Sequence, residues 1–142
     1  MERQPELPKD FIEKLESIAT ELEQAPPRRI DYIERVRIER PLFLMIKEIC
    51  RQHLGYDLHG LSSEHRDALY QYIEGKPGSK YLSNFIRHVF EVRVFLLKLS
   101  SSDPYVQGDA LLQVSVNGKD SFAFLARQIR ILVKEAREVV NE

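Results

Sequence analysis

The stretch "FIRHVFEVRVFLLKL", residues 85–99, decides the fold class, because its apolar residues cover nearly every side of a helix. A helix of this kind must be surrounded by other elements that shield it from water. Arginine, histidine and glutamate residues interrupt the stretch, so it is too polar to span a bilayer. It therefore predicts a central helix over residues 80–99, packed inside a helical protein.

Helical periodicity continues on both sides of this segment. Apolar residues recur at intervals of three and four in residues 11–22, 41–54, 65–73 and 125–140. Asp31 with Glu34 forms a capping box that opens a short basic helix ending near Arg40. Pro41 begins the following helix or marks a kink between the two. The pattern predicts an all-α fold, a compact bundle of about six or seven helices.

Residues 111–124 allow two interpretations. They contain Asn117-Gly118 between short runs of β-prone residues, which is a strong hairpin signal. The same pair also suits the end of a helix, with Asp120 or Ser121 capping the next one. We favour a helix–turn–helix, because an apolar stripe at helical spacing follows directly and a lone hairpin has no other strand to join.

The chain has 142 residues, which suits one domain with a substantial core. We expect residues 1–142 to form a single helical domain, with an acidic N-terminal helix in residues 1–27 and a core bundle in residues 28–142. The acidic part holds three basic and seven acidic residues, whereas residues 28–135 hold seventeen basic and thirteen acidic ones. The total formal charge is only −1, so any affinity for nucleic acid must come from local patches.

Cys50 is the single cysteine, so no disulfide can form within the chain. Its apolar neighbours predict that it packs as a small hydrophobe. No apolar segment near the N-terminus resembles a secretory signal. We therefore expect a cytoplasmic protein that does not enter the membrane.

The sequence contains none of the residue groups that commonly carry catalysis. The six glycines are scattered and form no phosphate-binding loop. No Cys/His cluster has zinc spacing, and His53, His59 and His65 recur every six residues, which places them on different faces of a helix. His88 lies within the most apolar helix, where we expect a hydrogen-bonded core or boundary histidine. The sequence predicts no enzyme activity, no cofactor and no metal site.

A cluster of positive charge lies in "ARQIRILVKEAR", residues 126–137. Its four cations, three, four and three residues apart, are Arg127, Arg130, Lys134 and Arg137. At 100° per residue these cations share an arc of about 80°, and most apolar residues of the helix fall on the opposite side. Burial of the apolar side would turn the cations outward together. Glu135 and Glu138 lie beside this cationic arc and offset part of its charge.

Two further groups of cations extend the pattern. The first group is Arg28, Arg29, Arg37, Arg40, Lys47 and Arg51, and the second is Lys80 and Arg87. The last four members of the first group form a ridge if the chain stays helical through Pro41. Arginine dominates, and its planar guanidinium suits bidentate binding of phosphate. Three interpretations remain open: binding to a nucleic-acid backbone, a solvated face, or docking of an acidic protein.

Two segments of the C-terminal half resemble the small subunit of a CRISPR effector complex. "SNFIRHVFEVRVFLL", residues 83–97, is similar to a Ser/Thr-started helix with an internal Ile-Arg in that family, and Arg87 matches its arginine. "ALLQVSVNGKDSFAFLARQ", residues 110–128, is similar to a Leu-rich segment followed by an aromatic-Ala-x-x-x-Arg helix, and Arg127 matches the arginine there. The resemblance fits type I and type III systems alike.

The resemblance implies a non-catalytic subunit of a ribonucleoprotein. Subunits of this family stack head to tail along the belly of the complex, hold its backbone filaments together and line a groove for nucleic acid. The implied partners are single-stranded nucleic acid (the target strand or the backbone of the guide heteroduplex), other subunits of the complex and further copies of this chain. The alternative function is a helical protein–protein adaptor or regulator that binds no nucleic acid.

Overall fold

The computed structural model of the chain describes residues 9–24, 30–76, 80–101 and 121–140. These residues form five helices and no strand: α1 (Lys9–Gln24), α2 (Tyr32–Leu54), α3 (Ser63–Ile73), α4 (Lys80–Leu99) and α6 (Ser121–Val140). The predicted all-α class is confirmed for this part of the chain. Within the same ranges, no helix is long and apolar enough to cross a membrane.

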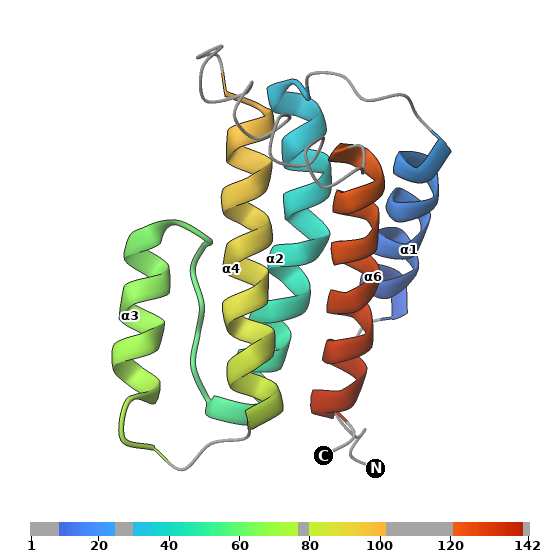
Figure 1. Cartoon of the computed structure of the whole chain (residues 1–142). Coiled ribbons are helices and arrows are strands. Elements are labelled where there is room, and N and C mark those ends of the chain that lie inside the picture. The colour runs from blue at the N-terminus through green and yellow to red at the C-terminus, as the bar shows by residue number, and fades with distance from the viewer. Residues whose placement is uncertain (1–8, 25–29, 77–79, 102–120, 141–142) are drawn as a thin grey trace.

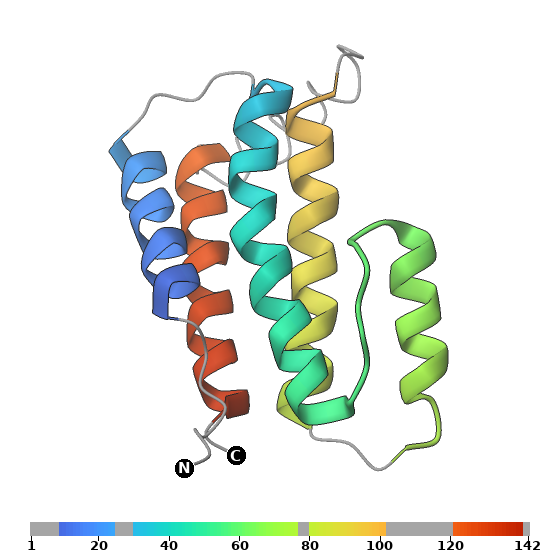
Figure 2. The same cartoon turned by 180° about the vertical axis from the view of Figure 1, so that it is seen from behind.

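Four of the helices form an antiparallel bundle (Figures 1 and 2). α6 packs against α1 and α4, and α2 packs against the same two helices, so the order around the ring is α1, α6, α4, α2. Neighbours in the ring run in opposite directions (Figure 1). This is the up-and-down arrangement in which each helix turns an apolar stripe to a shared core. α3 lies outside the ring, beside α4 (Figure 2).

α4 is the helix predicted over residues 80–99, and its apolar residues supply a large part of the core. Phe85, Ile86 and Val89 are 0% exposed, and Phe90 is 4% exposed. Val94, in the same apolar run, is instead 41% exposed. The reason is that α4 is one wall of the ring, so it keeps an outer side that the bundle does not cover.

α2 is a single helix where the sequence predicted two. It runs from Tyr32 to Leu54 with Pro41 inside it. Pro41 has no backbone N–H, so the carbonyl of Arg37 loses its usual helical partner. Pro41 and Leu42 are both buried, and this packing holds the helix together across the interruption. The predicted six or seven helices were counted over the whole chain. Because two of the predicted helices are one, the described residues contain five.

Capping residues set three of the helix ends, and the predicted cap Asp31 is one of them. The Asp31 side chain accepts the N–H of Glu34 at 2.8 Å and begins α2. Ser62 accepts the N–H of His65 at 3.3 Å and begins α3. Gly55 ends α2 with φ of 62°, a left-handed conformation that favours glycine. Local hydrogen bonding therefore fixes where these helices start and stop.

α3 is attached to the outer side of the bundle by ring contacts and one hydrogen bond. Residues 55–62 run back beside α4 before α3 begins (Figures 1 and 2), and Leu58 within them is 0% exposed. The rings of Tyr70 and Phe90 meet edge-on with centroids 6.4 Å apart. The hydroxyl of Tyr72 donates to the carbonyl of Leu54 at 2.8 Å. These contacts hold α3 against the bundle although it is not part of the ring.

Of residues 111–124, for which the sequence allows a hairpin or a helix–turn–helix, the structure describes only 121–124. Residues 121–124 belong to α6, so a hairpin that extends to Phe124 is wrong. Residues 111–120, including Asn117-Gly118 and the predicted cap Asp120, lie outside the described residues. The helix–turn–helix interpretation of those residues stays a prediction.

Candidate nucleic-acid interface

The cationic arc of α6 is divided by the packing of α1. The apolar stripe of α6 is buried, as predicted, and the four cations lie away from it. Arg130 and Arg137 face α1, and we call them the α1-facing edge. Arg127 and Lys134 lie on the other side of the arc, and we call them the outer edge. The two edges have different surroundings.

Carboxylates of α1 neutralise the α1-facing edge. Arg130 donates to Glu23 through Nε at 3.1 Å and through Nη2 at 2.8 Å, and Nη2 also donates to Thr20 Oγ1 at 3.0 Å. Arg137 donates to Glu16 Oε1 at 3.2 Å. Glu16, Thr20 and Glu23 are four and three residues apart, so they lie along one face of α1. This face therefore complements the spacing of the two arginines.

The pair between Arg130 and Glu23 is well formed but exposed to solvent. The hydrogen bond from Arg130 holds the pKa of Glu23 below its usual range, and the same bond raises the pKa of Arg130. The two side chains are 40% and 43% exposed, so solvent screens their attraction and it adds little to stability. Its main consequence is that the α1-facing edge offers less free positive charge to an anion.

The outer edge lacks such partners. Arg127 and Lys134 are exposed, and neither forms an ion pair with another described residue. They lie seven residues apart, about 10 Å along the helix axis at 1.5 Å per residue. Ile131, between them in sequence, is 38% exposed, and Glu138 is an exposed acid further along the helix. The outer edge is therefore a narrow strip with two unpaired cations and one acid.

The ridge predicted on α2 lies on one continuous helix, but most of its cations have partners. The pairs are Arg37 with Glu21, Lys47 with Asp57 and Arg51 with Glu48. Lys47 also donates to the carbonyl of Leu58 at 3.0 Å, so it ties the segment after α2 back to the helix. Arg40 is exposed and has no ion pair within the described part of the chain. Arg28 and Arg29 lie outside the described residues.

The cations predicted on α4 lie on a third helix. Lys80 begins α4 and is exposed, with no ion pair to another residue of the described ranges. Arg87 donates to Asn84 at 3.3 Å and lies 4.0 Å from Glu91. α2 and α6 occupy opposite corners of the ring, so their exposed faces point in different directions. The structure therefore does not bring the predicted cations together into one patch.

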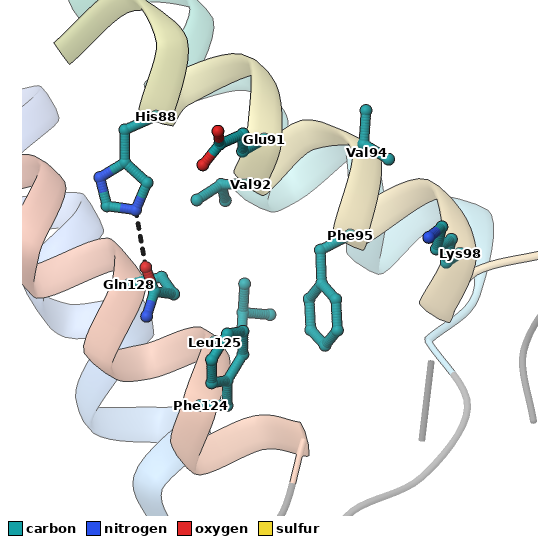
Figure 3. A pocket seen from close by; sticks show the side chains of 9 residues that line it. All are labelled: His88, Glu91, Val92, Val94, Phe95, Lys98, Phe124, Leu125 and Gln128. Atoms are coloured by element: carbon teal, nitrogen blue, oxygen red, sulfur yellow. Dashed lines mark hydrogen bonds between the residues drawn. The ribbon is translucent and has the colours of Figure 1, made fainter. Parts of the chain in front are cut away.

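Sequence reasoning missed a hydrogen-bonded group that joins α4 to α6. His88 Nδ1 lies 2.5 Å from Glu135 Oε1, and Nε2 lies 2.7 Å from Gln128 Oε1. The second of these contacts is visible in Figure 3. His88 is thus a hydrogen-bonded boundary residue, as its apolar surroundings predicted. Glu135 is held by this contact, so it is not a free acid beside the cationic arc.

A second missed group joins α2 to α4. Glu39 lies 3.7 Å from both Arg35 and Arg93. Burial raises the pKa of Glu39, although the two guanidiniums oppose the shift. The Nε atoms of both arginines and Oε1 of Glu39 are buried without a hydrogen-bond partner. The spacing of Arg35 and Glu39 on one helix was visible in the sequence, whereas the contact with Arg93 depends on packing.

The cysteine and histidine residues contribute packing and capping contacts. Cys50 is buried, and this burial raises the pKa of its thiol to about 12. The thiol therefore stays protonated and unreactive at neutral pH. His65 lies 2.7 Å from Ser62 Oγ through Nδ1, at the start of α3. In the described ranges, no group of three or more His, Cys, Asp or Glu residues is placed to hold a metal ion.

Comparison of the chain with protein-family models, with curated proteins and with solved structures finds no significant match. The candidate interface is therefore defined by the geometry of the chain itself. Its strongest element is the outer edge of α6, where Arg127 and Lys134 are both exposed and unpaired among the described residues.

Proposed function

We propose that this chain is a non-catalytic subunit of a ribonucleoprotein and that it holds a nucleic-acid backbone through the outer edge of α6. The proposal rests on a difference in ion pairing among the cations of α6. Arg127 and Lys134 are exposed without an ion-pair partner among the described residues, whereas α1 holds Arg130 and Arg137. Unpaired surface cations gain most from a polyanion, because they displace its counterions without first breaking a salt bridge.

The resemblance to CRISPR small subunits supports the same proposal. Arg127 is the residue that matches the arginine of the second motif, and it lies on the outer edge. An all-α bundle also agrees with a subunit of that kind. Under this proposal, the chain packs beside other subunits of an effector complex and beside further copies of itself.

The outer edge is suited to weak contacts with the phosphate backbone. Each cation that neutralises a phosphate contributes about −0.7 to the salt dependence of single-strand binding. Two such contacts give a slope of only about −1.4, so the isolated chain should bind weakly. Several copies along one strand would bind much more tightly, because each later contact becomes intramolecular. Phosphate contacts carry no sequence information, so binding should be independent of base sequence.

The test is reversal of the two unpaired charges. Arg127→Glu with Lys134→Glu should keep the fold and lose most of the affinity for single-stranded DNA or RNA, measured by fluorescence anisotropy between about 50 and 200 mM salt. Lys14→Glu with Lys76→Glu is a matched control, because it changes the net charge equally on exposed residues of α1 and of the segment after α3. Equal losses in the two variants, or no loss in the first, would contradict the proposal.

An adaptor function is favoured by a different surface. Tyr32 and Ile33 are 68% and 76% exposed at the start of α2, and Val36 one turn later is 38% exposed. Exposed apolar residues that adjoin one another often mark a protein–protein contact. If the chain shows no salt-dependent affinity for nucleic acid, and Ile33→Asp abolishes its association with a partner protein, the adaptor function is the correct one.

A further inference from the structure

We infer that the hollow between α4 and α6 is a binding site for one indole-sized aromatic group that carries a hydrogen-bond donor. Figure 3 shows the hollow from close by, with α4 along one side and α6 along the other. The site is distinct from the outer edge of α6 and does not depend on the proposed function.

The volume of the hollow limits the size of the ligand. It measures about 220 Å³. An apolar cavity of about 150 Å³ in another protein holds benzene. A cavity half as large again suits a group of two fused rings better than a single ring or an extended chain.

The walls of the hollow are apolar on both helices. α4 contributes Val92 and Phe95, and α6 contributes Phe124 and Leu125. The rings of Phe95 and Phe124 stand 5.3 Å apart at 63°, so a flat ring beside them can make edge-to-face contacts. A nucleobase fits these walls poorly, because several polar atoms on its edges would remain without partners.

The polar groups of the hollow lie at its rim. They include Glu91, which can accept a hydrogen bond from a ligand, and Lys98, whose ammonium can only donate. Glu91 is 66% exposed, and its nearest charged partner, Arg87, is 4.0 Å away. An ionised carboxylate accepts hydrogen bonds and cannot donate them. Glu91 can therefore take the N–H of an indole or the O–H of a naphthol. His88 and Gln128 already bind each other at the other part of the rim (Figure 3).

Val94 gives a way to close the site without disturbing the core. It lines the hollow and is 41% exposed, so a larger side chain there has room toward solvent. Val94→Trp would cover the opening with an indole of the chain itself. An unchanged melting temperature would show that the variant folds as the wild type does.

The experiment is an NMR titration of the ¹⁵N-labelled chain with indole. We expect saturable shifts confined to residues 91–98 and 124–128 in the wild type, and affinity at least about tenfold weaker in Val94→Trp, as for loss of a central anchor. 1-Methylindole, which has no N–H, should bind several-fold more weakly than indole, and Glu91→Ala should remove that difference. Lack of saturable shifts, or equal binding by Val94→Trp, would overturn the inference.

A second titration identifies the source of the aromatic group. A capped Ala-Trp-Ala peptide presents the same indole as a protein side chain. If it binds as well as indole, the site receives a tryptophan of a partner protein. If only free indole binds, the site receives a small molecule. Both results support an aromatic site and differ only in what fills it.

Discussion

The two edges of the cationic arc carry similar side chains, yet their surroundings give them different roles. Arg130 and Arg137 lie against a helix that supplies Glu23 and Glu16 at matching positions. Arg127 and Lys134 have no acidic neighbour of this kind among the described residues. Spacing along one helix therefore identifies candidate binding residues, and the neighbouring helix decides which of them stay available.

The largest effect should come from removing the packing that holds α1 against the bundle. Leu15 on α1 is 0% exposed. Leu15→Ala should reduce the free energy of unfolding by about 2–5 kcal/mol, measured by chemical denaturation. Ser17→Ala is a matched control on the exposed side of α1 and should change it by less than about 0.5 kcal/mol. If Leu15→Ala also reduced the free energy of unfolding by less than about 0.5 kcal/mol, α1 would not be packed over the α1-facing edge.

A smaller but more specific effect is expected on affinity. Glu16→Gln with Glu23→Gln frees Arg130 and Arg137, so it should strengthen nucleic-acid binding and steepen its salt dependence by up to about 1.4 for a single strand. The control is Asp10→Asn with Glu13→Gln, which removes equal charge from exposed residues of the same helix. If both variants gain equally, the gain reflects net charge and the α1-facing edge is not a masked site.

Much of the fold followed from the sequence because it depends on local patterns. The apolar stripes identified α1, α3, α4 and α6 with nearly correct ends, and Asp31 was correctly predicted to begin a helix. The division of α2 at Pro41 was wrong, because a local rule about proline was outweighed by burial of that residue and its neighbours. The apolar run of α4 could not predict that Val94 is exposed, since its exposure depends on which side of α4 the ring leaves open.

The candidate site was less predictable than the fold. All four cations of the arc were found, but their pairing depends on contacts between residues more than 100 positions apart, such as Arg130 with Glu23. The spacing of Glu16 and Glu23 on α1 carried a usable signal, because it matches that of Arg130 and Arg137 in reverse order. The hydrogen bonds of His88 gave no comparable signal, since they join residues of mixed type across two helices.

A still smaller effect is expected on the pH dependence of the pair between Arg130 and Glu23. The pKa of Glu23 lies below 4.5 because Arg130 donates to its carboxylate. A group with a lowered pKa in the folded state stabilises the fold above its unfolded pKa, and this contribution is lost as pH falls through the folded value. The contribution is therefore present at neutral pH and lost below pH 4.5.

The measurement is a carboxyl NMR titration of Glu23 in the wild type and in Arg130→Gln. The substitution should move the pKa of Glu23 back toward 4.5, because the first cause of its shift is the hydrogen bond from Arg130. An unchanged value would mean that the pair does not persist in solution. In that case, both edges of the arc would be equally available to an anion.

The smallest effects are expected from substitutions of Glu135 and Glu138, the two acids that the sequence places beside the cationic arc. Glu138 is exposed on the side of the outer edge, so Glu138→Gln should strengthen nucleic-acid binding slightly and leave stability unchanged. Glu135 instead accepts a hydrogen bond from His88, and the two side chains are 24% and 15% exposed. Glu135→Gln should therefore cost about 0.5–1.5 kcal/mol of stability, as for one partly buried hydrogen bond, and leave affinity unchanged.

Chemical denaturation measures the stability of each variant, and fluorescence anisotropy measures its affinity for nucleic acid. Glu135→Gln should change only stability, and Glu138→Gln should change only affinity. This result would show that the neighbouring helix decides the role of acids as well as cations. If Glu135→Gln strengthened binding as much as Glu138→Gln, the contact with His88 would be too weak to withhold Glu135 from the surface field. The outer edge would then extend toward α4, and Arg87, whose contact with Glu91 is 4.0 Å, would be the next cation to test.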